Sequence, residues 1–264
     1  MIRGKLALML DFIPVPPDFE ELGLFDVEIQ HSVLSSGTPV TVAIPETSLG
    51  FGLVFHPDIN GLRPLVEETI AKLAGLGITT IAIEPFSRMS DNPSELTLEE
   101  KFARIKDLDD NAQCADLLAA GQILRTQHNC MFVSMMGFCI GGMYAFKCAG
   151  TGEFDDVISC YGMITLPQDW KGPGQREPLD YVAMETSSPV IAIVGGQDHY
   201  APSDDVEKLS EILNNKHHKE ILSELIVFPD ADHAFMHDPD RDTFRADDAK
   251  SAWALALDVV KQIY

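Results

Sequence analysis

Short apolar runs rich in β-branched residues alternate with longer segments of helical period along this chain, and this alternation constrains the fold more than any other feature. Most of the short runs are almost continuously apolar, as expected for parallel strands that are covered on both faces. Repeated βα units predict an α/β fold with a doubly wound, mostly parallel sheet and helices on both faces. We predict strands at residues 39–44, 52–56, 79–83, 131–136, 157–161, 190–194 and 225–228. We predict helices at residues 64–76, 107–126, 141–149, 203–213 and 246–263.

Two longer stretches, residues 86–106 and residues 162–189, interrupt this alternation. Each follows the carboxyl end of a predicted strand, and open α/β sheets place their sites at that edge. Long loops in a compact domain often act as lids, so we expect both stretches to border the site. The length of 264 residues fits one large α/β domain, and we expect residues 1–264 to form a single domain.

The charge and the cysteine count exclude several classes of function. The net charge of −22 argues against nucleic acid or an anionic membrane as a partner, because phosphates favour positive charge. No apolar run is long enough to span a bilayer, and the run at residues 6–10 is too short for a signal peptide. Five cysteines without a CxxC pair argue against a disulfide framework or a zinc site. We therefore expect a cytoplasmic protein that binds a small molecule and uses no metal or other cofactor.

Residues 131–142 read Met-Phe-Val-Ser-Met-Met-Gly-Phe-Cys-Ile-Gly-Gly, an apolar strand that runs into a glycine-rich turn and then into a helix. This is the strand–turn–helix arrangement of the G-x-S-x-G motif of α/β-hydrolases, with Cys139 in place of serine. Gly137 and Gly141 allow strand and helix to approach at a strained turn. Cys139 lies at a helix N-terminus, which favours a thiolate, and the N–H of Ile140 can face a developing oxyanion. The alternative is a buried structural cysteine in a phosphate-binding loop.

A nucleophile of this kind requires an acid and a histidine later in the chain, in that order. Asp198 follows one predicted strand end, and His233 follows the next. Of the eight histidines, His233 combines the required chain order with a position on a loop. We therefore predict that His233 is the base and Asp198 the acid that orients it. Asp204 and Asp205 are the alternative acids, although they resemble the start of the next helix.

Three motifs together resemble those of the dienelactone hydrolase (carboxymethylenebutenolidase) family. They are Gly-Phe-Cys-Ile-Gly-Gly at 137–142, Gly-Gly-Gln-Asp-His at 195–199 and Asp-His-Ala-Phe at 232–235. The similarity extends from about Gly50 to the C-terminus. The resemblance implies an α/β-hydrolase fold and a cysteine-dependent hydrolase of a small ester or lactone, which acts through a Cys-His-Asp triad and an acyl-enzyme intermediate.

The resemblance also implies roles outside the triad. Asp58 stands where the family has a glutamate that contacts the resting thiol, and the N–H of Ile59 is the second oxyanion donor. Arg88 corresponds to one of two arginines that bind a substrate carboxylate, and His237 stands at the position of the other. An imidazole is a poor substitute for a guanidinium, so this departure argues against dienelactone itself as the substrate. Without the resemblance, the segment around Asp58 is an ordinary turn and Arg88 is a solvated loop residue.

Other functions remain open at this point. The same triad could cleave a thioester or remove a halogen, the fold could serve as a non-catalytic binding protein, and Cys139 could act as a redox sensor. Turnover of p-nitrophenyl acetate that iodoacetamide abolishes would separate the hydrolases from the last two.

Overall fold

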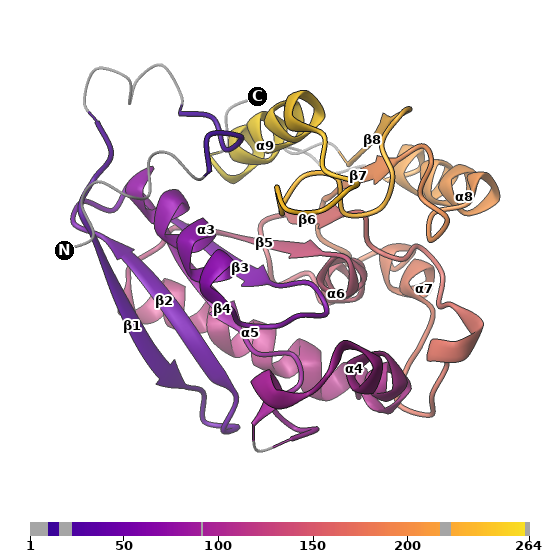
Figure 1. The fold of residues 1–264 in the computed structure, drawn as a ribbon, viewed down its shortest axis with the longest axis horizontal. Helices are drawn as coiled ribbons and strands as arrows, with labels where there is room; N and C mark the ends of the chain where they lie inside the picture. The colour runs from indigo at the N-terminus through magenta and orange to yellow at the C-terminus, as the bar shows by residue number, and fades with distance from the viewer. Residues whose placement is uncertain (1–9, 16–22, 91, 217–222, 262–264) are drawn as a thin grey trace.

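The computed structural model describes residues 10–15, 23–90, 92–216 and 223–261, and within these residues the strands form one eight-stranded sheet (Figure 1). The strands are β1 (Val27–Val33), β2 (Pro39–Pro45), β3 (Phe51–His56), β4 (Ile78–Ile83), β5 (Phe132–Phe138), β6 (Val157–Cys160), β7 (Val190–Gly195) and β8 (Glu224–Phe228). Their order is β1-β2-β4-β3-β5-β6-β7-β8. The first two neighbouring pairs in this order are antiparallel, and the remaining pairs are parallel. The predicted mostly parallel sheet is confirmed.

Helices cover both faces of this sheet, as the sequence predicts. In Figure 1, α3 and α9 lie on one side of the sheet, and α5 and α6 lie on the other. No helix within the described ranges combines the length and the apolarity needed to cross a bilayer. The helices are α3 (Pro64–Gly75), α4 (Leu98–Arg104), α5 (Asp110–Gln127), α6 (Ile140–Ala149), α7 (Pro178–Val182), α8 (Ser203–Asn214) and α9 (Ala246–Val260).

The predicted elements are present, with ends that differ by a few residues, but strand β1 was not predicted. Its sequence, Val-Glu-Ile-Gln-His-Ser-Val, alternates polar and apolar residues, and most of its side chains are exposed. A search for continuous apolar runs misses such an edge strand, because only one of its faces meets the core. The predicted start of α5 moves to Asp110, since the side chain of Asp109 caps the helix by accepting from the N–H of Ala112. Residue 263, the predicted end of the last helix, lies outside the described residues.

The two stretches that interrupt the alternation carry short helices. Residues 86–106 contain α4, whose first turn is closed by a capping box between Thr97 and Glu100. Residues 162–189 contain α7 and a 3-10 turn at Gln168–Trp170. Both stretches follow the carboxyl ends of strands, so they lie at the same edge as the loops after β3, β5, β7 and β8. This edge holds the candidate site.

Candidate active site

Cys139 lies between β5 and α6 in a backbone conformation that side chains rarely adopt, with φ 57° and ψ −116°. Such strain costs about 1–3 kcal/mol and is typical of functional turns. The neighbouring glycines make the turn possible. A Cβ on Gly137 would lie 2.0 Å from the carbonyl oxygen of Gly141, and a Cβ on Gly141 would lie 2.3 Å from that of His56. The predicted strained strand–turn–helix is confirmed.

His233 and Asp198 come from the loops after the neighbouring parallel strands β8 and β7. The Nδ1–H of His233 donates to Oδ2 of Asp198 at 2.7 Å. The other oxygen of Asp198 accepts from the N–H of Tyr200 at 2.8 Å, which orients the carboxylate. The structure therefore brings together the base and the acid that the sequence predicts.

The second ring nitrogen of His233 is available for chemistry. This Nε2 atom is buried and has no hydrogen bond of standard geometry within the described residues, although the Cys139 sulfur is near enough to interact with the ring. Burial alone lowers the pKa of His233, but the nearby Cys139 sulfur and the Asp198 carboxylate raise it to about 10. His233 is therefore placed to hold a proton between the sulfur and the carboxylate.

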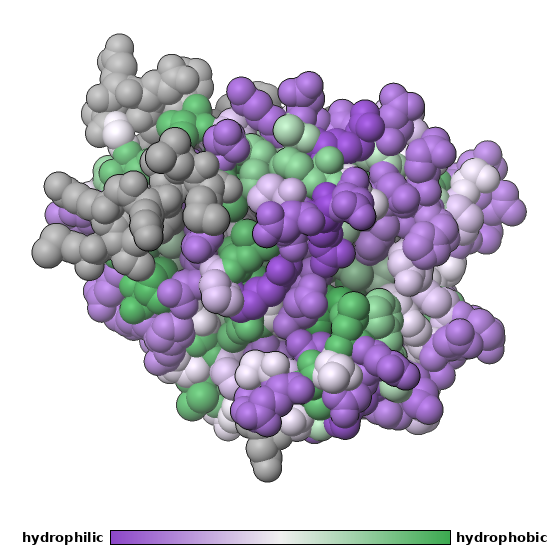
Figure 2. All heavy atoms as spheres, viewed as in Figure 1, coloured by the Kyte–Doolittle hydropathy of each residue, from purple (hydrophilic) through white to green (hydrophobic). Residues whose placement is uncertain are grey.

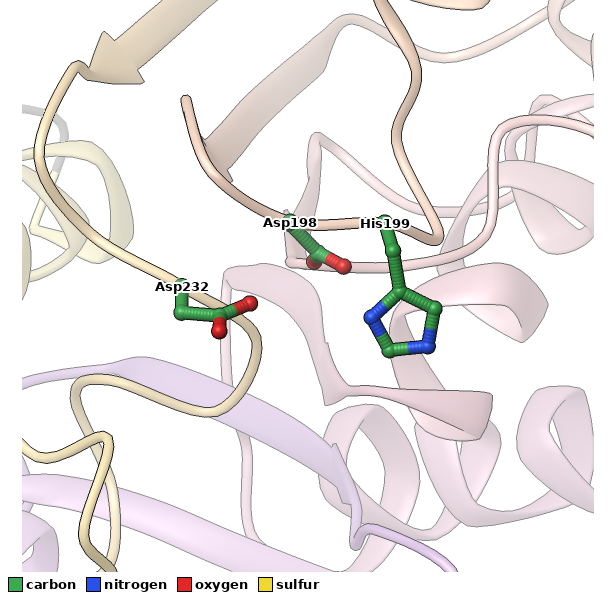
Figure 3. Close-up of side chains that lie close together, drawn as sticks. All are labelled: Asp198, His199 and Asp232. Atoms are coloured by element: carbon green, nitrogen blue, oxygen red, sulfur yellow. The ribbon is translucent and has the colours of Figure 1, made fainter.

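A second carboxylate lies beside this pair. Figure 3 shows Asp198 and His199 on one loop, with Asp232 approaching from the loop after β8. One polar atom from each of these three side chains lies within 4.8 Å of the other two, which is close enough for metal ligands. However, Asp198 already accepts hydrogen bonds on both oxygens, and Asp232 accepts from the N–H of His233 at 2.6 Å. Both carboxylates of the group are thus bonded to His233, Asp198 at the ring and Asp232 at the backbone.

Cys139 and His233 line one cavity of about 90 Å³. Its polar lining comes from Asp58, Asn60 and Arg241. Its apolar lining includes Leu98 and Phe102 from the first interrupting stretch and Trp170 from the second, so both stretches border this cavity. Tyr200, from the loop after β7, also lines it.

Comparisons with known proteins identify the family. The model of the dienelactone hydrolase family matches residues 39–264. The chain belongs to the dienelactone hydrolase family. It is therefore an α/β-hydrolase-fold enzyme of the class that hydrolyses carboxylic ester and lactone bonds.

Individual relatives agree with this membership. A Bradyrhizobium protein named "Probable 2-oxo-3-(5-oxofuran-2-ylidene)propanoate lactonase" is 29% identical over 205 residues, which cover 76% of this chain and 79% of that protein. An Escherichia coli K12 protein named "Putative carboxymethylenebutenolidase" is 25% identical over 97% of this chain and 88% of its own length. A crystal structure described as "Putative Dienelactone Hydrolase" from Klebsiella pneumoniae has a TM-score of 0.78 at 22% identity and covers 90% of this chain and 99% of its own. That structural likeness shows the shared fold.

The two predicted oxyanion donors have free N–H groups. Ile140 is the first residue of α6, and Ile59 lines the cavity on the loop after β3. Within the described part of the chain, no acceptor forms a hydrogen bond with either N–H. The turn around Ile59 is closed by a hydrogen bond from the N–H of Gly61 to the carbonyl oxygen of Asp58 at 3.0 Å. Both amides are candidates for binding the oxyanion.

Asp58 lines the cavity, but its carboxylate is held by other groups. Its Oδ2 atom accepts from Arg241 at 2.7 Å, from His237 at 3.0 Å and from Arg63 at 3.4 Å. Burial raises the pKa of Asp58, but His237 and the two guanidinium groups hold it well below its usual range. None of the hydrogen bonds among the described residues joins Asp58 to Cys139. The structure thus shows no hydrogen bond of the kind that the resemblance implies.

His237 lies behind the cavity and does not line it. Its ring packs against Phe138 at 5.2 Å between centroids, and burial lowers its pKa. As a neutral imidazole it donates from Nε2 to Asp58, and its Nδ1 accepts from the hydroxyl of Tyr161 at 2.5 Å. Both nitrogens are occupied, so the structure does not present His237 to a substrate.

Arg88 is also kept away from the cavity. Its guanidinium forms two hydrogen bonds with the buried carboxylate of Asp116 on α5, one of them at 2.9 Å. The sequence reading did not anticipate that Asp116 is buried and needs a positive partner. The guanidinium that does line the cavity belongs to Arg241, which sequence reasoning missed. Its position eight residues after His233, on the same loop, is a signal that could have indicated it.

Proposed function

We propose that this enzyme hydrolyses small carboxylic esters or lactones through Cys139, His233 and Asp198. The observation that carries the proposal is how the two ring nitrogens of His233 are bonded. One ring nitrogen is bonded to Asp198, while the other is buried without a hydrogen bond of standard geometry among the described residues, and His233 lines the same cavity as the strained Cys139. A nucleophile, a base and an orienting acid in this relation are the arrangement that acyl transfer requires.

The reaction begins when the sulfur of Cys139, whose proton is held by Nε2 of His233, attacks the ester carbonyl carbon. The carbonyl oxygen becomes an oxyanion, which the N–H groups of Ile140 and Ile59 stabilise. Collapse of this intermediate breaks the carbon–oxygen bond, and His233 returns the proton to the leaving alcohol oxygen. Asp198 keeps the imidazole in the required tautomer and stabilises its protonated form. With a lactone, the released hydroxyl stays attached to the acyl chain.

Hydrolysis of the thioester completes the cycle. His233 removes a proton from water, which attacks the acyl carbon, and the second oxyanion uses the same donors. Collapse releases the carboxylic acid and returns the proton to the sulfur. No step requires a metal ion or an organic cofactor.

The part of the substrate that lies beside Cys139 has to be small, since the cavity measures about 90 Å³. We assign recognition of a substrate carboxylate to Arg241, because Arg88 is bound to Asp116 and His237 is buried behind the cavity. Arg241 is also bound to Asp58, so an anionic substrate shares this guanidinium with an internal carboxylate.

Trapping the acyl-enzyme tests the proposal. The protein is mixed with p-nitrophenyl acetate and quenched in acid within the first turnovers, and its mass is compared with that of Cys139→Ala. We expect a burst of p-nitrophenol and a mass increase of one acetyl group that maps to Cys139. Iodoacetamide should abolish both signals. A full rate in Cys139→Ala, or after alkylation, would contradict the assignment of the nucleophile.

A further inference from the structure

Two large apolar side chains on α4 are exposed although they line the cavity. Leu98 is 50% exposed and Phe102 is 36% exposed, and their four-residue spacing places them on one face of the helix. Figure 2 shows apolar side chains gathered on the surface beside α4. A group of exposed apolar side chains at the mouth of a cavity indicates a surface that a ligand covers.

Aromatic rings connect this exposed face to the reacting groups. The ring of Phe102 lies 6.1 Å from that of Trp170, which lies 5.6 Å from that of Tyr200. The ring of Tyr200 lies 5.0 Å from the imidazole of His233. The apolar lining is therefore continuous from the surface to the base.

The size of the cavity shows that this lining extends beyond what a small ester fills. A cavity of about 150 Å³ is what encloses one benzene molecule in an engineered protein. At about 90 Å³, the cavity here holds the ester group and little more. A larger substituent of the bound substrate has to extend out of the cavity through its mouth, where it contacts Leu98 and Phe102. Contact with these side chains is favourable for an apolar group and unfavourable for a charged one.

We propose that Leu98, Phe102 and Trp170 bind an apolar, preferably aromatic, substituent of the substrate, which extends from the ester toward the surface. This inference rests on the proposed function and names the substrate class for the same site. The substrate is an ester or lactone with a flat apolar group on one side of the reacting carbonyl. Aromatic rings in offset or edge-to-face contact attract each other beyond what burial of their area provides, so an aryl group is favoured over an alkyl chain.

Other residues hold α4 in place, so truncating the apolar face should leave the helix docked. Lys101 lies between Leu98 and Phe102 in sequence and is 5% exposed, and its Nζ atom donates to the carbonyl oxygen of Asn60 at 2.8 Å. Arg104 donates to the carbonyl oxygen of Met89 at 2.7 Å. The exposed face of α4 can therefore be tested separately from the position of the helix.

The test compares kcat/KM for pairs of esters that differ in one apolar group. One pair is ethyl and benzyl acetate, and the other is methyl acetate and methyl phenylacetate, so that the substituent lies on the alcohol side or on the acyl side. We expect the wild type to prefer the aryl member of one pair. Phe102→Ala should reduce that preference about ten-fold, and Leu98→Ala should reduce it less, as expected for a few lost contacts.

Leu255→Ala is the matched control, because Leu255 is a 36% exposed leucine on α9 that does not line the cavity. It should leave the preference unchanged. Circular dichroism of each variant checks the fold, and Leu98→Ala replaces Phe102→Ala if the latter does not fold. Equal preferences in wild type, Phe102→Ala and Leu98→Ala overturn the apolar site. Absence of hydrolysis of both small acetates by the wild type instead overturns the proposed function.

Discussion

His233 and His237 lie four residues apart on the loop after β8, and each forms a hydrogen bond with a carboxylate from another loop. His233 is bonded to Asp198 at 2.7 Å, and His237 is bonded to Asp58 at 3.0 Å. Both imidazoles also contact the ring of Tyr161, at 5.2 and 5.6 Å between centroids. The two pairs are built from the same residue types within one short segment.

The pairs differ in what happens to the second ring nitrogen. That of His233 lacks a partner among the described residues and is close enough to Cys139 for the sulfur to raise the pKa of His233. That of His237 accepts from Tyr161, and burial lowers the pKa of His237. A buried His–Asp pair thus suits general base catalysis where one nitrogen is left free beside the nucleophile. Where both are occupied, the pair connects parts of the fold.

The second pair contributes to the position of the loop that carries Ile59. Asp58 and Asn60 flank Ile59 in the chain, and the Asp58 carboxylate accepts from the N–H of Asn60 at 3.0 Å as well as from His237. A carboxylate bound in this way limits rotation of the peptide units around Ile59. We therefore expect changes at His237 to act through this loop, while changes at His233 act on the proton transfer itself.

The largest loss of kcat should come from removing the side chain of Cys139 or of His233. We expect Cys139→Ala and His233→Ala each to reduce kcat by about 10⁴–10⁶-fold, because each removes a member of a unit that works together. Stopped-flow or long-time assays with one activated ester measure both. The double variant should be little worse than either single variant. If the losses multiply instead, the two residues do not act in the same step.

Replacing Asp198 or Asp58 by asparagine should reduce kcat by very different factors. Asp198→Asn should reduce kcat by about 10⁴-fold, as loss of the correct tautomer does in the serine protease triad. Asp58→Asn should reduce kcat by about ten- to a hundred-fold, because it disturbs one oxyanion donor only. Measured kcat and KM for both variants decide this. Similar losses in the two variants would remove the distinction between the pairs.

Arg241 connects the His237–Asp58 side to the cavity and should control selectivity for charge. We expect Arg241→Ala to reduce the preference for an ester with a carboxylate over its neutral methyl ester by about ten- to a hundred-fold, the value of one charge-assisted contact. Arg88→Ala is the matched control, since Arg88 binds Asp116 and does not line the cavity. Should Arg88→Ala change this preference and Arg241→Ala leave it, the anion site belongs to Arg88.

Replacing His237 should show whether this residue positions Asp58 and its loop or takes part in proton transfer. His237→Gln retains an N–H that can reach Asp58, so we expect a loss of kcat of only a few-fold. His237→Leu leaves the carboxylate and the hydroxyl of Tyr161 without this partner, and the free energy of unfolding should fall by about 1–3 kcal/mol. Urea denaturation and kcat of both variants test this. Equal, large losses of kcat would indicate that His237 exchanges protons during the reaction.

The last predictions concern pH, and the stability contributions of the two histidines should change with pH in opposite directions. His233 has a raised pKa of about 10, so its contribution to stability is complete below about pH 6.5 and is lost as the pH rises toward 10. His237 has a lowered pKa, so its contribution is present above about pH 6.5 and is lost as the pH falls.

NMR titration of the His233 and His237 imidazoles measures the difference between their pKa values directly. We expect the pKa of His233 to fall in Cys139→Ala, because the sulfur is the largest of the influences that raise it. His237 should be unaffected by this change. Unfolding experiments from pH 5 to 10 should show a flatter acid limb in His237→Gln. An unchanged pKa of His233 in Cys139→Ala would show that the Cys139 sulfur does not influence the His233 imidazole.

The features of the candidate site whose geometry agrees with the sequence prediction are local in the chain. The turn at Cys139 depends on glycines two residues away on either side, and the helix that follows begins at the next residue. Asp198 and His233 each follow a strand end directly, and parallel neighbours bring such ends together. The strand β1 was missed although its signal was local, because its alternating pattern differs from that of the buried strands.

The sequence by itself determined the βα alternation, the strained turn at Cys139 and the approach of Asp198 to His233, because each depends on residues close together in the chain or on the geometry of parallel strands. The tertiary structure decided which arginine reaches the cavity. Arg88 is bound to Asp116, 28 residues away, and Arg241 to Asp58, 183 residues away. A charged side chain is positioned by the buried opposite charge that it meets in the fold, and no local pattern around Arg88 or Arg241 specifies that partner.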